Sequence, residues 1–552
     1  MKGNNLLTTR QTFKQIIDGN MIYVDKTACL ANMIERNRKT WFLARPRRFG
    51  KSLTVSTLES IFTGQKHLFI DLAIEKKLDL PLFAPRPVIH LDMSSLSTSK
   101  GLDDFDKSLR LTTADVAMDH GLELPRDLPA SYMFSKLIKG CQQKYDRQVA
   151  VLIDEYDTPI TDLFDEPVEA EKVRKVLREY YRQLKVCDQY ISFVFVTGIT
   201  KFVQGGLYSA FNNPVDISMD TQYGVLTGFT HKEIKHYFNY QLKEVAKSLK
   251  ITKTKLLDMM KEYYNGFCFD GKTLVYNPHS ILLFFDAKVF ANFWFNSGTP
   301  DQLISFMRQK HLTVDKFRGL KVLQDRLRNP RQERFQDPAV YLYQLGYLSL
   351  KSSPSDDVFI LDYPNFEVLQ SMSLLLLEDY FNDSNEASEM CFGVKQALSE
   401  RDPAALVAQF NLLLSKFPYD YHQKKRDEFF YCPPILTLFF AMGLDIRAEQ
   451  HGNWGRADFV VTYKAQNWII EVKVSYNDTK DSQLAAGALT QIKEKNYGGG
   501  CQNPVLLGIV INDTTRLIST WECQGGLSAK PEVKEEKNDD DDAPKTSGPR
   551  SF

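Results

Sequence analysis

Four apolar runs lie in the first part of the chain, at residues 41–44, 87–93, 149–153 and 191–196. Each run is apolar along most of its length instead of at every second position. A strand of this kind is buried on both faces, which is typical of a parallel sheet covered by helices. The segments between the runs have helical periodicity. The pattern therefore predicts an α/β domain with a parallel sheet over residues 1–229.

The first run leads into the segment RPRRFGKS, residues 45–52, which is followed by a predicted helix. A phosphate-binding loop needs a tight backbone, the positive end of a helix and a lysine. Gly50 supplies the tight backbone, Lys51 supplies the cation, and Ser52 supplies a hydroxyl for Mg²⁺. Arg45 stands where the usual pattern has its first glycine. Taken alone, the segment fits a phosphate-binding loop or a basic turn between a strand and a helix.

Acidic and polar residues end the next buried runs. The third run ends in Asp154 and Glu155, and the fourth ends at Thr197. Ligands of parallel sheets bind at the carboxyl ends of the strands. We therefore expect Asp154 to organise Mg²⁺ and Glu155 to polarise the attacking water of a bound nucleoside triphosphate. Thr197, or Lys201 beyond it, is a candidate sensor of the terminal phosphate.

Three arginines, Arg45, Arg47 and Arg48, stand in the glycine-lysine-serine segment. They have three interpretations: they neutralise phosphates, contact a partner, or form a basic face.

The carboxyl-terminal part has its own compact pattern. We predict a domain over residues 427–527, with an αβββαβ order of helix 428–443, strands 445–449, 457–463 and 468–474, helix 482–496 and strand 504–511. Asp458 lies on one of these strands, and Glu471 and Lys473 lie two residues apart on the next. Residues two apart project from the same face of a strand, so Glu471 and Lys473 can address one metal-bound water. A glutamate-x-lysine pair alone also fits a charged strand face, but with Asp458 it predicts a Mg²⁺-dependent phosphodiesterase site.

Several motifs together resemble a known family. The sequences RPRRFGKSLT, VLIDEYDTPI, FVTGITKF, YNGFCF, YNPHSIL, LYQLGYL and DYPNFEV are similar to those of predicted AAA-ATPase-like proteins, which often end in a PD-(D/E)xK nuclease domain. The resemblance runs from about Phe13 to Tyr497. That family normally lacks the first loop glycine, so Arg45 agrees with it. The resemblance implies an additional-strand, AAA-like P-loop core that binds ATP, with the sensor strand between the strands leading to Lys51 and Asp154.

The nuclease resemblance adds two residues to the carboxyl-terminal site. Glu428 matches the position where PD-(D/E)xK nucleases often place another acidic residue, and Gln491 matches the helical glutamine of one subset. The resemblance implies a restriction-endonuclease-like domain with Glu428, Asp458 and Glu471 around the metal and with Lys473 and Gln491 beside it. Lys493 and Lys495, on the same predicted helix as Gln491, are candidates for phosphate contacts.

Two further regions carry no obvious chemistry. Residues 230–426 are predicted to be a mostly helical lid or linker that starts at a capping box of Thr230 and Glu233. Residues 528–552 combine Lys/Glu alternation with four consecutive aspartates, and we expect this acidic tail to be disordered. Either region is a candidate surface for a protein partner.

Composition sets limits without naming a substrate. Lys and Arg total 69 and Asp and Glu total 69, so net charge neither indicates nor excludes nucleic acid. The eight cysteines show no paired or metal-like spacing and are expected to be reduced. The longest apolar stretch, residues 435–444, is about half of the ~20 residues that a membrane span needs. The sequence therefore predicts a cytoplasmic protein without a membrane partner.

These observations predict an ATP-binding and ATP-hydrolysing protein that couples a P-loop ATPase to a Mg²⁺-dependent nuclease acting on DNA. The alternative is a nucleotide-dependent switch or interaction protein whose nuclease-like domain binds nucleic acid or a partner without cleavage. Assembly into a homo-oligomer is compatible with both.

Overall fold

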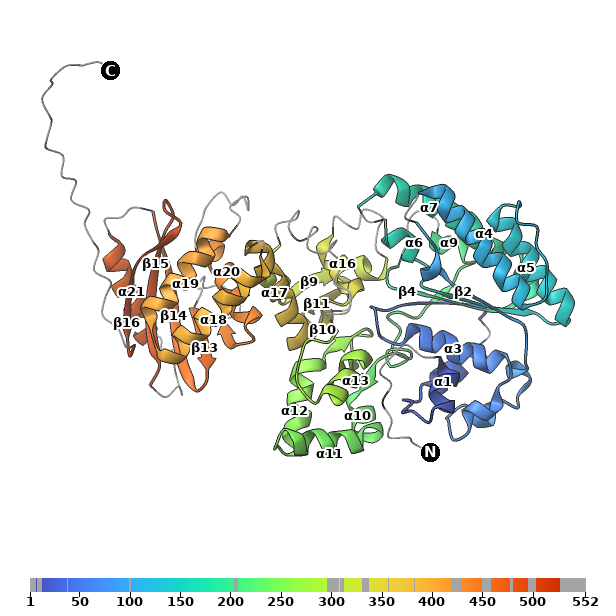
Figure 1. Cartoon of the computed structure of the whole chain (residues 1–552), viewed down its shortest axis with the longest axis horizontal. Helices are drawn as coiled ribbons and strands as arrows, with labels where there is room; N and C mark the ends of the chain where they lie inside the picture. The colour runs from blue at the N-terminus through green and yellow to red at the C-terminus, as the bar shows by residue number, and fades with distance from the viewer. Residues whose placement is uncertain are drawn as a thin grey trace, which may run out of the picture. The chain divides into compact units, whose positions relative to one another are not determined.

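The computed structural model describes residues 6, 12–36, 38–98, 101–163, 165–201, 207–294, 307, 312–329, 337–355, 357–381, 383–417, 428–448, 458–476, 480–494 and 503–526. The chain forms two compact units, which we describe separately (Figure 1). Unit 1 contains Met1–Asp379 and Leu436–Gly443, and unit 2 contains Tyr380–Ile435 and Leu444–Phe552. The predicted acidic tail, residues 528–552, lies outside the described residues. The predicted boundaries after residues 229, 426 and 527 stay predictions.

Unit 1 is built around a five-stranded parallel sheet with the order β2-β3-β4-β1-β5. Its strands are β1 (Thr40–Ala44), β2 (Val88–Asp92), β3 (Val149–Asp154), β4 (Ile191–Gly198) and β5 (Val215–Asp216). All four apolar runs form strands, as predicted. The strand β4 lies between β1, which leads to Lys51, and β3, which ends at Asp154. This order confirms the additional-strand arrangement.

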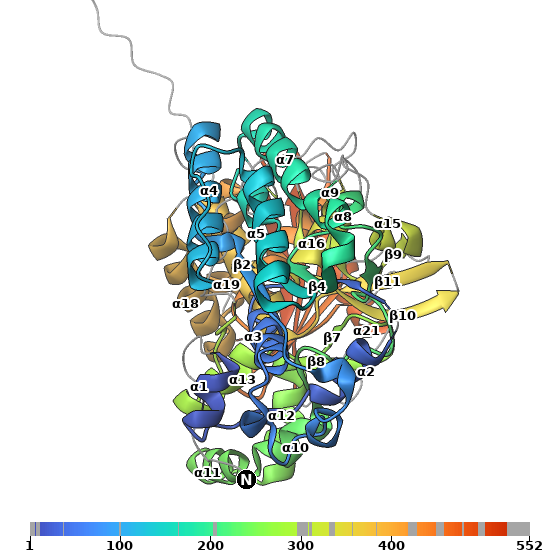
Figure 2. The ribbon, with the colours of Figure 1, turned by 90° about the vertical axis from the view of Figure 1, so that its right-hand side faces the viewer.

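Helices cover both faces of this sheet (Figures 1 and 2). One face packs on α1 (Phe13–Asp18), α2 (Thr27–Glu35) and α3 (Lys51–Phe62), through strand residues that include Trp41, Leu43 and Leu152. The other face packs on α4 (Leu102–Asp119), α5 (Ala130–Tyr145) and α7 (Pro167–Tyr181). Because neighbouring strand residues serve opposite faces, the runs had to be apolar throughout. Shorter helices in this region are α6 (Thr158–Thr161), α8 (Gln183–Val186) and α9 (Leu207–Ala210).

The middle of the chain is mostly helical, as predicted. Its helices include α10 (His231–Tyr237), α11 (Asn239–Ser248), α12 (Lys253–Tyr264), α13 (Pro278–Ala287), α15 (Gln324–Arg328), α16 (Pro338–Leu345) and α17 (Phe366–Phe381). The predicted capping box at Thr230 and Glu233 is present at the start of α10. Two three-stranded sheets were not predicted, and the strands of the first are only two or three residues long. They are β6 (Phe229–Thr230), β8 (Leu274–Tyr276) and β7 (Phe267–Cys268), and β10 (Ser349–Ser355), β11 (Val358–Asp362) and β9 (Leu320–Leu323).

Unit 2 contains a second five-stranded sheet with the order β12-β13-β14-β15-β16. Its strands are β12 (Asp445–Ala448), β13 (Asp458–Tyr463), β14 (Gln466–Ser475), β15 (Val505–Asn512) and β16 (Leu517–Gln524). The helices here are α18 (Ser384–Glu400), α19 (Pro403–Lys416), the start of α20 (Glu428–Ala441) and α21 (Asp481–Glu494). The predicted αβββαβ order is confirmed, and β16 is an additional edge strand that the sequence analysis missed. Only β14 and β15 pair in parallel among the strands of this sheet.

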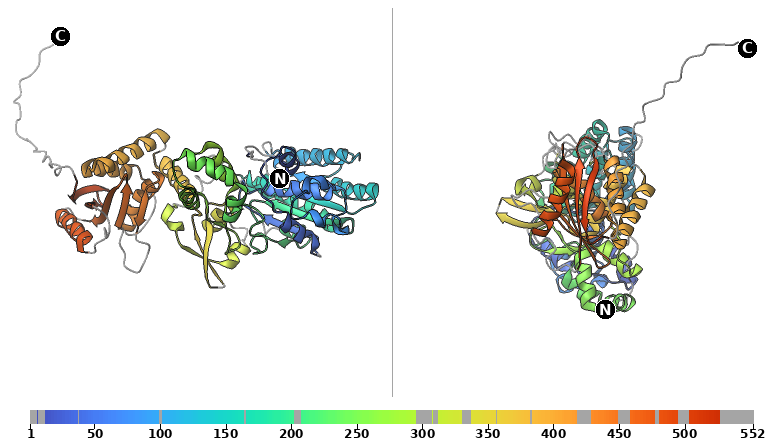
Figure 3. Two further views of the ribbon diagram at one scale, coloured as in Figure 1. Left: turned by 90° about the horizontal axis from the view of Figure 1, so that it is seen from below. Right: turned by 90° about the vertical axis from the view of Figure 1, so that its left-hand side faces the viewer.

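The two faces of this sheet meet different helices (Figure 3, right). On one face, the Trp468 indole nitrogen donates to the Leu398 carbonyl of α18 at 3.1 Å. On the other face, α21 packs so closely that a Cβ on Gly508 would lie 2.8 Å from the Ala488 Cβ. Glu471 is three residues from Trp468 on the same strand and therefore faces α21. Within the described residues, no helix is both long and apolar enough to cross a bilayer.

Candidate functional sites

The glycine-lysine-serine segment forms a tight turn between β1 and α3. Gly50 has φ +91° and ψ 24° and stands immediately before the first residue of α3. A side chain at Gly50 would meet nothing within 4 Å, so the requirement for glycine comes from its left-handed backbone. Lys51 and Ser52 are the first two residues of the helix, where the backbone N–H groups and the helix dipole favour an anion. The local geometry is that of a phosphate-binding loop.

The Lys51 side chain is folded against its own loop. Its ammonium donates to the carbonyl oxygens of Arg45, at 3.1 Å, and Pro46, at 3.2 Å. It also lies 3.5 Å from Oε1 of Glu155, and the lysine side chain is only 3% exposed. Phosphate oxygens can replace these acceptors without leaving the buried ammonium unpaired.

Two acids at the end of β3 face the start of α3. Asp154 is buried and is hydrogen-bonded by the Ser52 side chain and, at 3.0 Å, by the Glu155 backbone N–H. Burial, with the nearby charge of Glu155, raises the pKa of Asp154 despite the Ser52 hydrogen bond. Glu155 has φ +51°, a left-handed conformation that a non-glycine residue rarely adopts. The structure thus brings together the predicted residues Gly50, Lys51, Ser52, Asp154 and Glu155.

Thr197 and Lys201, the candidate phosphate sensors, are placed differently. Thr197 is fully buried, and its hydroxyl donates to the Leu43 carbonyl at 2.9 Å across the sheet. Lys201 pairs with Asp216 and donates to the Arg328 carbonyl. Ile199, between them, lines the cavity described below, whereas Thr197 and Lys201 are not among the described lining residues.

The side chains of the three loop arginines do not all lie in the same surroundings. Arg45 is only 1% exposed, and its guanidinium lies 4.2 Å from the Phe269 ring and bonds to Thr227 Oγ1 and the Ser218 carbonyl. None of the three predicted interpretations therefore applies to Arg45, because its side chain turns into the protein core. Arg47 and Arg48 both line the cavity, so they remain candidates for neutralising phosphates.

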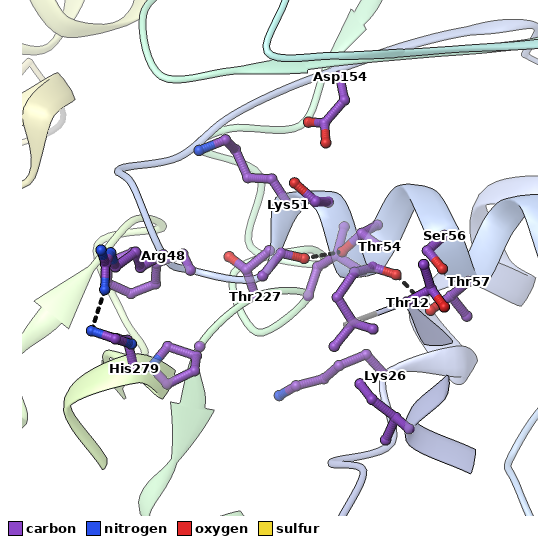
Figure 4. A pocket seen from close by; sticks show the side chains of 18 of the residues that line it. Thr12, Lys26, Arg48, Lys51, Thr54, Ser56, Thr57, Asp154, Thr227 and His279 are labelled. Carbon is purple, nitrogen blue, oxygen red and sulfur yellow. Dashed lines mark hydrogen bonds between the residues drawn. The ribbon is translucent and has the colours of Figure 1, made fainter. Parts of the chain in front are cut away.

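A cavity of about 890 Å³ opens at this edge of the sheet. Figure 4 shows Lys51 and Asp154 beside it, with Arg48 and His279 in contact at one side. The phosphate-loop residues form one end, and residues of α13 and the segment before α2 form further walls. Apolar lining residues away from the loop are Ile16, Ile22, Val24, Leu30, Phe229, Leu282 and Leu283.

His279 is a cavity residue that the sequence analysis did not identify. It lies at the start of α13, within the motif YNPHSIL, and contacts Arg48 of the loop. Burial and the neighbouring Arg48 lower the pKa of His279 to about 4. The neutral ring can therefore accept a hydrogen bond from the guanidinium. The motif itself was the available signal, but nothing local to it indicates the loop as its partner.

A second cluster surrounds Glu471 in unit 2. The Glu471 side chain is 1% exposed, and the Lys473 ammonium donates to its Oε1 at 2.6 Å. The Gln491 side-chain amide, on α21, donates to the same oxygen. Glu428, at the start of α20, places its Oε1 3.7 Å from the Lys473 ammonium. Four of the five predicted residues therefore meet at one end of β14.

The fifth predicted residue, Asp458, is described here by its backbone alone. It is the first residue of β13 and pairs in register with Glu471. Oε2 of Glu471 is buried and has no hydrogen-bond partner among the described residues. A buried carboxylate oxygen in this state suits a divalent cation, which prefers oxygen ligands. Within the same residues, no three His, Cys, Asp or Glu side chains form a metal-binding group.

Two family models match the chain. One, described as predicted AAA-ATPase, matches residues 9–208, and the other, the PD-(D/E)XK nuclease superfamily, matches residues 426–521. The matched regions contain the loop site and the Glu471 cluster respectively. The two-domain architecture predicted from the sequence motifs is therefore confirmed.

Known proteins similar to this chain include one relative and two solved structures. The relative, "Uncharacterized protein in vnfD 5'region" of Azotobacter chroococcum mcd 1, is 29% identical over 494 residues, covering 88% of this chain and 92% of the relative. The structures are the Aeropyrum pernix ORC2 protein in ADPNP-ADP complexes and the ORC1 protein of the same organism in complex with DNA. Each of the two structures is 10% identical to this chain, and the match covers 96% of the solved chain. They cover 64% and 65% of this chain, with TM-scores of 0.27 and 0.28.

Proposed function

We propose that this chain binds and hydrolyses ATP in unit 1 and uses the nucleotide state to control Mg²⁺-dependent cleavage of DNA by unit 2. The observation that carries the proposal is the presence of two assembled sites in one chain. Lys51, Ser52, Asp154 and Glu155 line one cavity. Glu428, Lys473 and Gln491 surround Glu471.

The nucleotide site divides into a polar end and an apolar end. The backbone N–H groups at the start of α3, with Lys51, Arg47 and Arg48, suit the phosphates. The apolar walls around Ile22, Val24 and Leu282 suit a nucleoside base. A cavity of about 890 Å³ is large enough for a whole nucleoside triphosphate.

Hydrolysis would divide the polar residues by role. Mg²⁺, when bound through Ser52 and Asp154, supplies charge neutralisation on the phosphates. Lys51 exchanges its backbone acceptors for outer phosphate oxygens. We assign Glu155 the role of orienting and deprotonating the attacking water. Its carboxylate lies 3.5 Å from the Lys51 ammonium at the phosphate end, which supports this role. Thr197 stays a proposal for sensing the terminal phosphate, since the strand that carries it leads to Ile199, which lines the cavity.

The Glu471 cluster suits phosphodiester hydrolysis. Mg²⁺, when bound through Glu471 with Asp458 and Glu428, supplies a Lewis acid and lowers the pKa of a bound water. Lys473 carries the positive charge that stabilises the developing negative charge of the scissile phosphate. Gln491 holds Oε1 of Glu471 and thereby leaves Oε2 for the cation.

The test is cleavage of circular and linear DNA with Mg²⁺, with and without ATP. We expect cleavage by the intact protein, loss of cleavage in Lys473→Ala, and altered ATP dependence in Lys51→Ala. The exposed lysines Lys480 and Lys66 provide matched controls, and their alanine variants should behave like the wild type. An intact protein that binds nucleotide but neither binds nor cuts nucleic acid refutes the nuclease part.

Other outcomes separate the remaining proposals. Lys51-dependent ATP binding with nucleic-acid binding but no cleavage would support the nucleotide-dependent switch. Cleavage of RNA instead of DNA would change only the substrate. A cytoplasmic location, a homo-oligomer and a protein partner on the middle region are also part of the proposal, and localisation and sedimentation measurements test them.

A further inference from the structure

Glu367 is a buried carboxylate that neither proposed site uses. It lies in the motif DYPNFEV, at the second residue of α17, and is 0% exposed. Its carboxylate accepts from the Ser280 hydroxyl at 2.9 and 3.2 Å and from the Trp294 backbone N–H at 2.7 Å. Burial raises the pKa of Glu367 to about 7 in spite of these bonds. Burying a carboxylate costs free energy unless it is hydrogen-bonded, and the partners of Glu367 come from two other segments of the chain.

The first partner, Ser280, belongs to the start of α13. Asn277 caps this helix by accepting from the backbone N–H groups of His279, at 2.9 Å, and Ser280, at 3.2 Å. His279 then reaches Arg48 at the cavity (Figure 4). A bond that fixes Ser280 therefore also fixes the helix turn that presents His279.

The second partner, Trp294, contacts the phosphate-binding loop. Its indole nitrogen donates to the Arg47 carbonyl at 3.2 Å, and its ring lies 5.3 Å from the Tyr347 ring. Gly346, in the motif LYQLGYL, has φ +91°, and a Cβ there would lie 2.7 Å from the Pro46 side chain. The motifs containing Ser280, Gly346 and Glu367 thus converge on loop residues 46–48.

We propose that Glu367 is a positioning residue of the nucleotide site. Its carboxylate holds the start of α13 and Trp294 in contact with the loop. These contacts set the positions of Arg47, Arg48 and His279 around the phosphates. This inference rests on the proposed nucleotide binding by unit 1. Glu367 contacts neither nucleotide nor metal, but it determines how tightly the site binds the phosphates of the nucleotide.

The test is the affinity of the full-length protein for a fluorescent ATP analogue with Mg²⁺. Glu367→Ala removes the acceptor from both partners, and we expect affinity to fall about tenfold or more. Glu367→Gln keeps an acceptor for the Trp294 N–H and should restore affinity to within about threefold of the wild type. Glu378→Gln is the matched control, because Glu378 is a partly exposed glutamate on the same helix, and it should bind like the wild type.

Milder variants keep the proposal testable if Glu367→Ala does not fold. Ser280→Ala removes the hydroxyl of α13 that donates to Glu367. Trp294→Phe removes the indole N–H that donates to Arg47 and shortens the ring that packs on Phe267 and Tyr347. Each should weaken nucleotide binding with an unchanged far-ultraviolet circular dichroism spectrum. Wild-type affinity in these two variants and in any folded Glu367→Ala protein would overturn the inference while leaving the proposed function standing. Absence of nucleotide binding in the wild type would overturn the proposed function and this inference together.

Discussion

At each site, a charged side-chain atom is held by more than one neighbouring residue. Oε1 of Glu471 accepts from both Lys473 and Gln491, so each donor limits where the carboxylate can turn. Lys51 similarly donates to loop carbonyls and lies near Glu155. The chemistry at each site therefore depends on which partner holds a charged atom, as well as on which residues are present.

Gln491 offers a test of this dependence. Gln491→Ala removes a donor from the buried Glu471 carboxylate, so we expect the DNA cleavage rate to fall about 10–100-fold while ATP binding is unchanged. Gln483→Ala, an exposed glutamine on the same helix, is the control. Single-turnover cleavage assays measure the difference. Equal rates in the two variants would show that Gln491 does not position Glu471.

At the scale of elements, Asp157 ties the end of β3 to the end of β4. Its carboxylate accepts from the backbone N–H of Ile199 at 3.2 Å and from the backbone N–H and hydroxyl of Thr200, each at 2.6 Å. A Cβ on Gly198 would lie 2.2 Å from Oδ1 of Asp157, so the two strand ends meet closely. Ile199, which this contact positions, lines the cavity.

The Asp157 contact should make stability depend on pH. Burial, with the charge of Glu155, raises the pKa of Asp157 from 3.8 to about 6. The folded state then binds the proton of Asp157 more tightly than the unfolded state does. The stabilisation that this protonation contributes is therefore complete below pH 3.8 and is lost as the pH rises to about 6. Asp157→Asn cannot ionise, and its stability relative to the wild type should increase by on the order of 3 kcal/mol between pH 4 and pH 7.

Denaturant unfolding of the wild type and variant at both pH values measures this change. Asp157→Ala provides the contrast, because it leaves two backbone N–H groups without their acceptor and should destabilise the protein at both pH values, by about 1–3 kcal/mol per group. A stability difference between Asp157→Asn and the wild type that does not change with pH would contradict the argument.

At the scale of the whole molecule, the chain divides into two compact units, each with its own five-stranded sheet and candidate site. The sheet of unit 1 is parallel throughout, whereas the sheet of unit 2 has a single parallel pair, β14 and β15. Separate sheets with separate cores favour separate unfolding transitions.

Calorimetry of the full chain tests this organisation. We expect two transitions. In the constant presence of Mg²⁺, a non-hydrolysable ATP analogue should raise the midpoint temperature of only the transition that belongs to unit 1. At a ligand concentration about 100 times the dissociation constant, the added stability is about 2.7 kcal/mol. Lys51→Ala should abolish this shift. A single transition, or an equal shift of both, would show that the units unfold together.

Sequence patterns alone predicted most of the sheet strands in both matched regions and the residues of each local motif. Buried strands, tight turns and helix caps depend on residues close together in the chain, so their patterns are visible in Gly50-Lys51-Ser52, in the acids after β3, and in Glu471 with Lys473. The sequence analysis missed the edge strand β16. Its buried residues, Ile518 and Trp521, are three apart instead of two, and the strand pairs on one side only.

The packing of whole elements selects the distant residues that complete the sites. Arg45 had three interpretations, as a phosphate ligand, a partner contact or part of a basic face, but its side chain contacts Thr227 and Phe269. The Thr197 hydroxyl donates to the Leu43 carbonyl. His279 and Glu367 reach the loop from far along the chain, and their local patterns indicate burial or a helix start without naming a partner. Periodicity reports which face of an element is covered, whereas the choice of partner depends on how whole elements pack, and that information is not local.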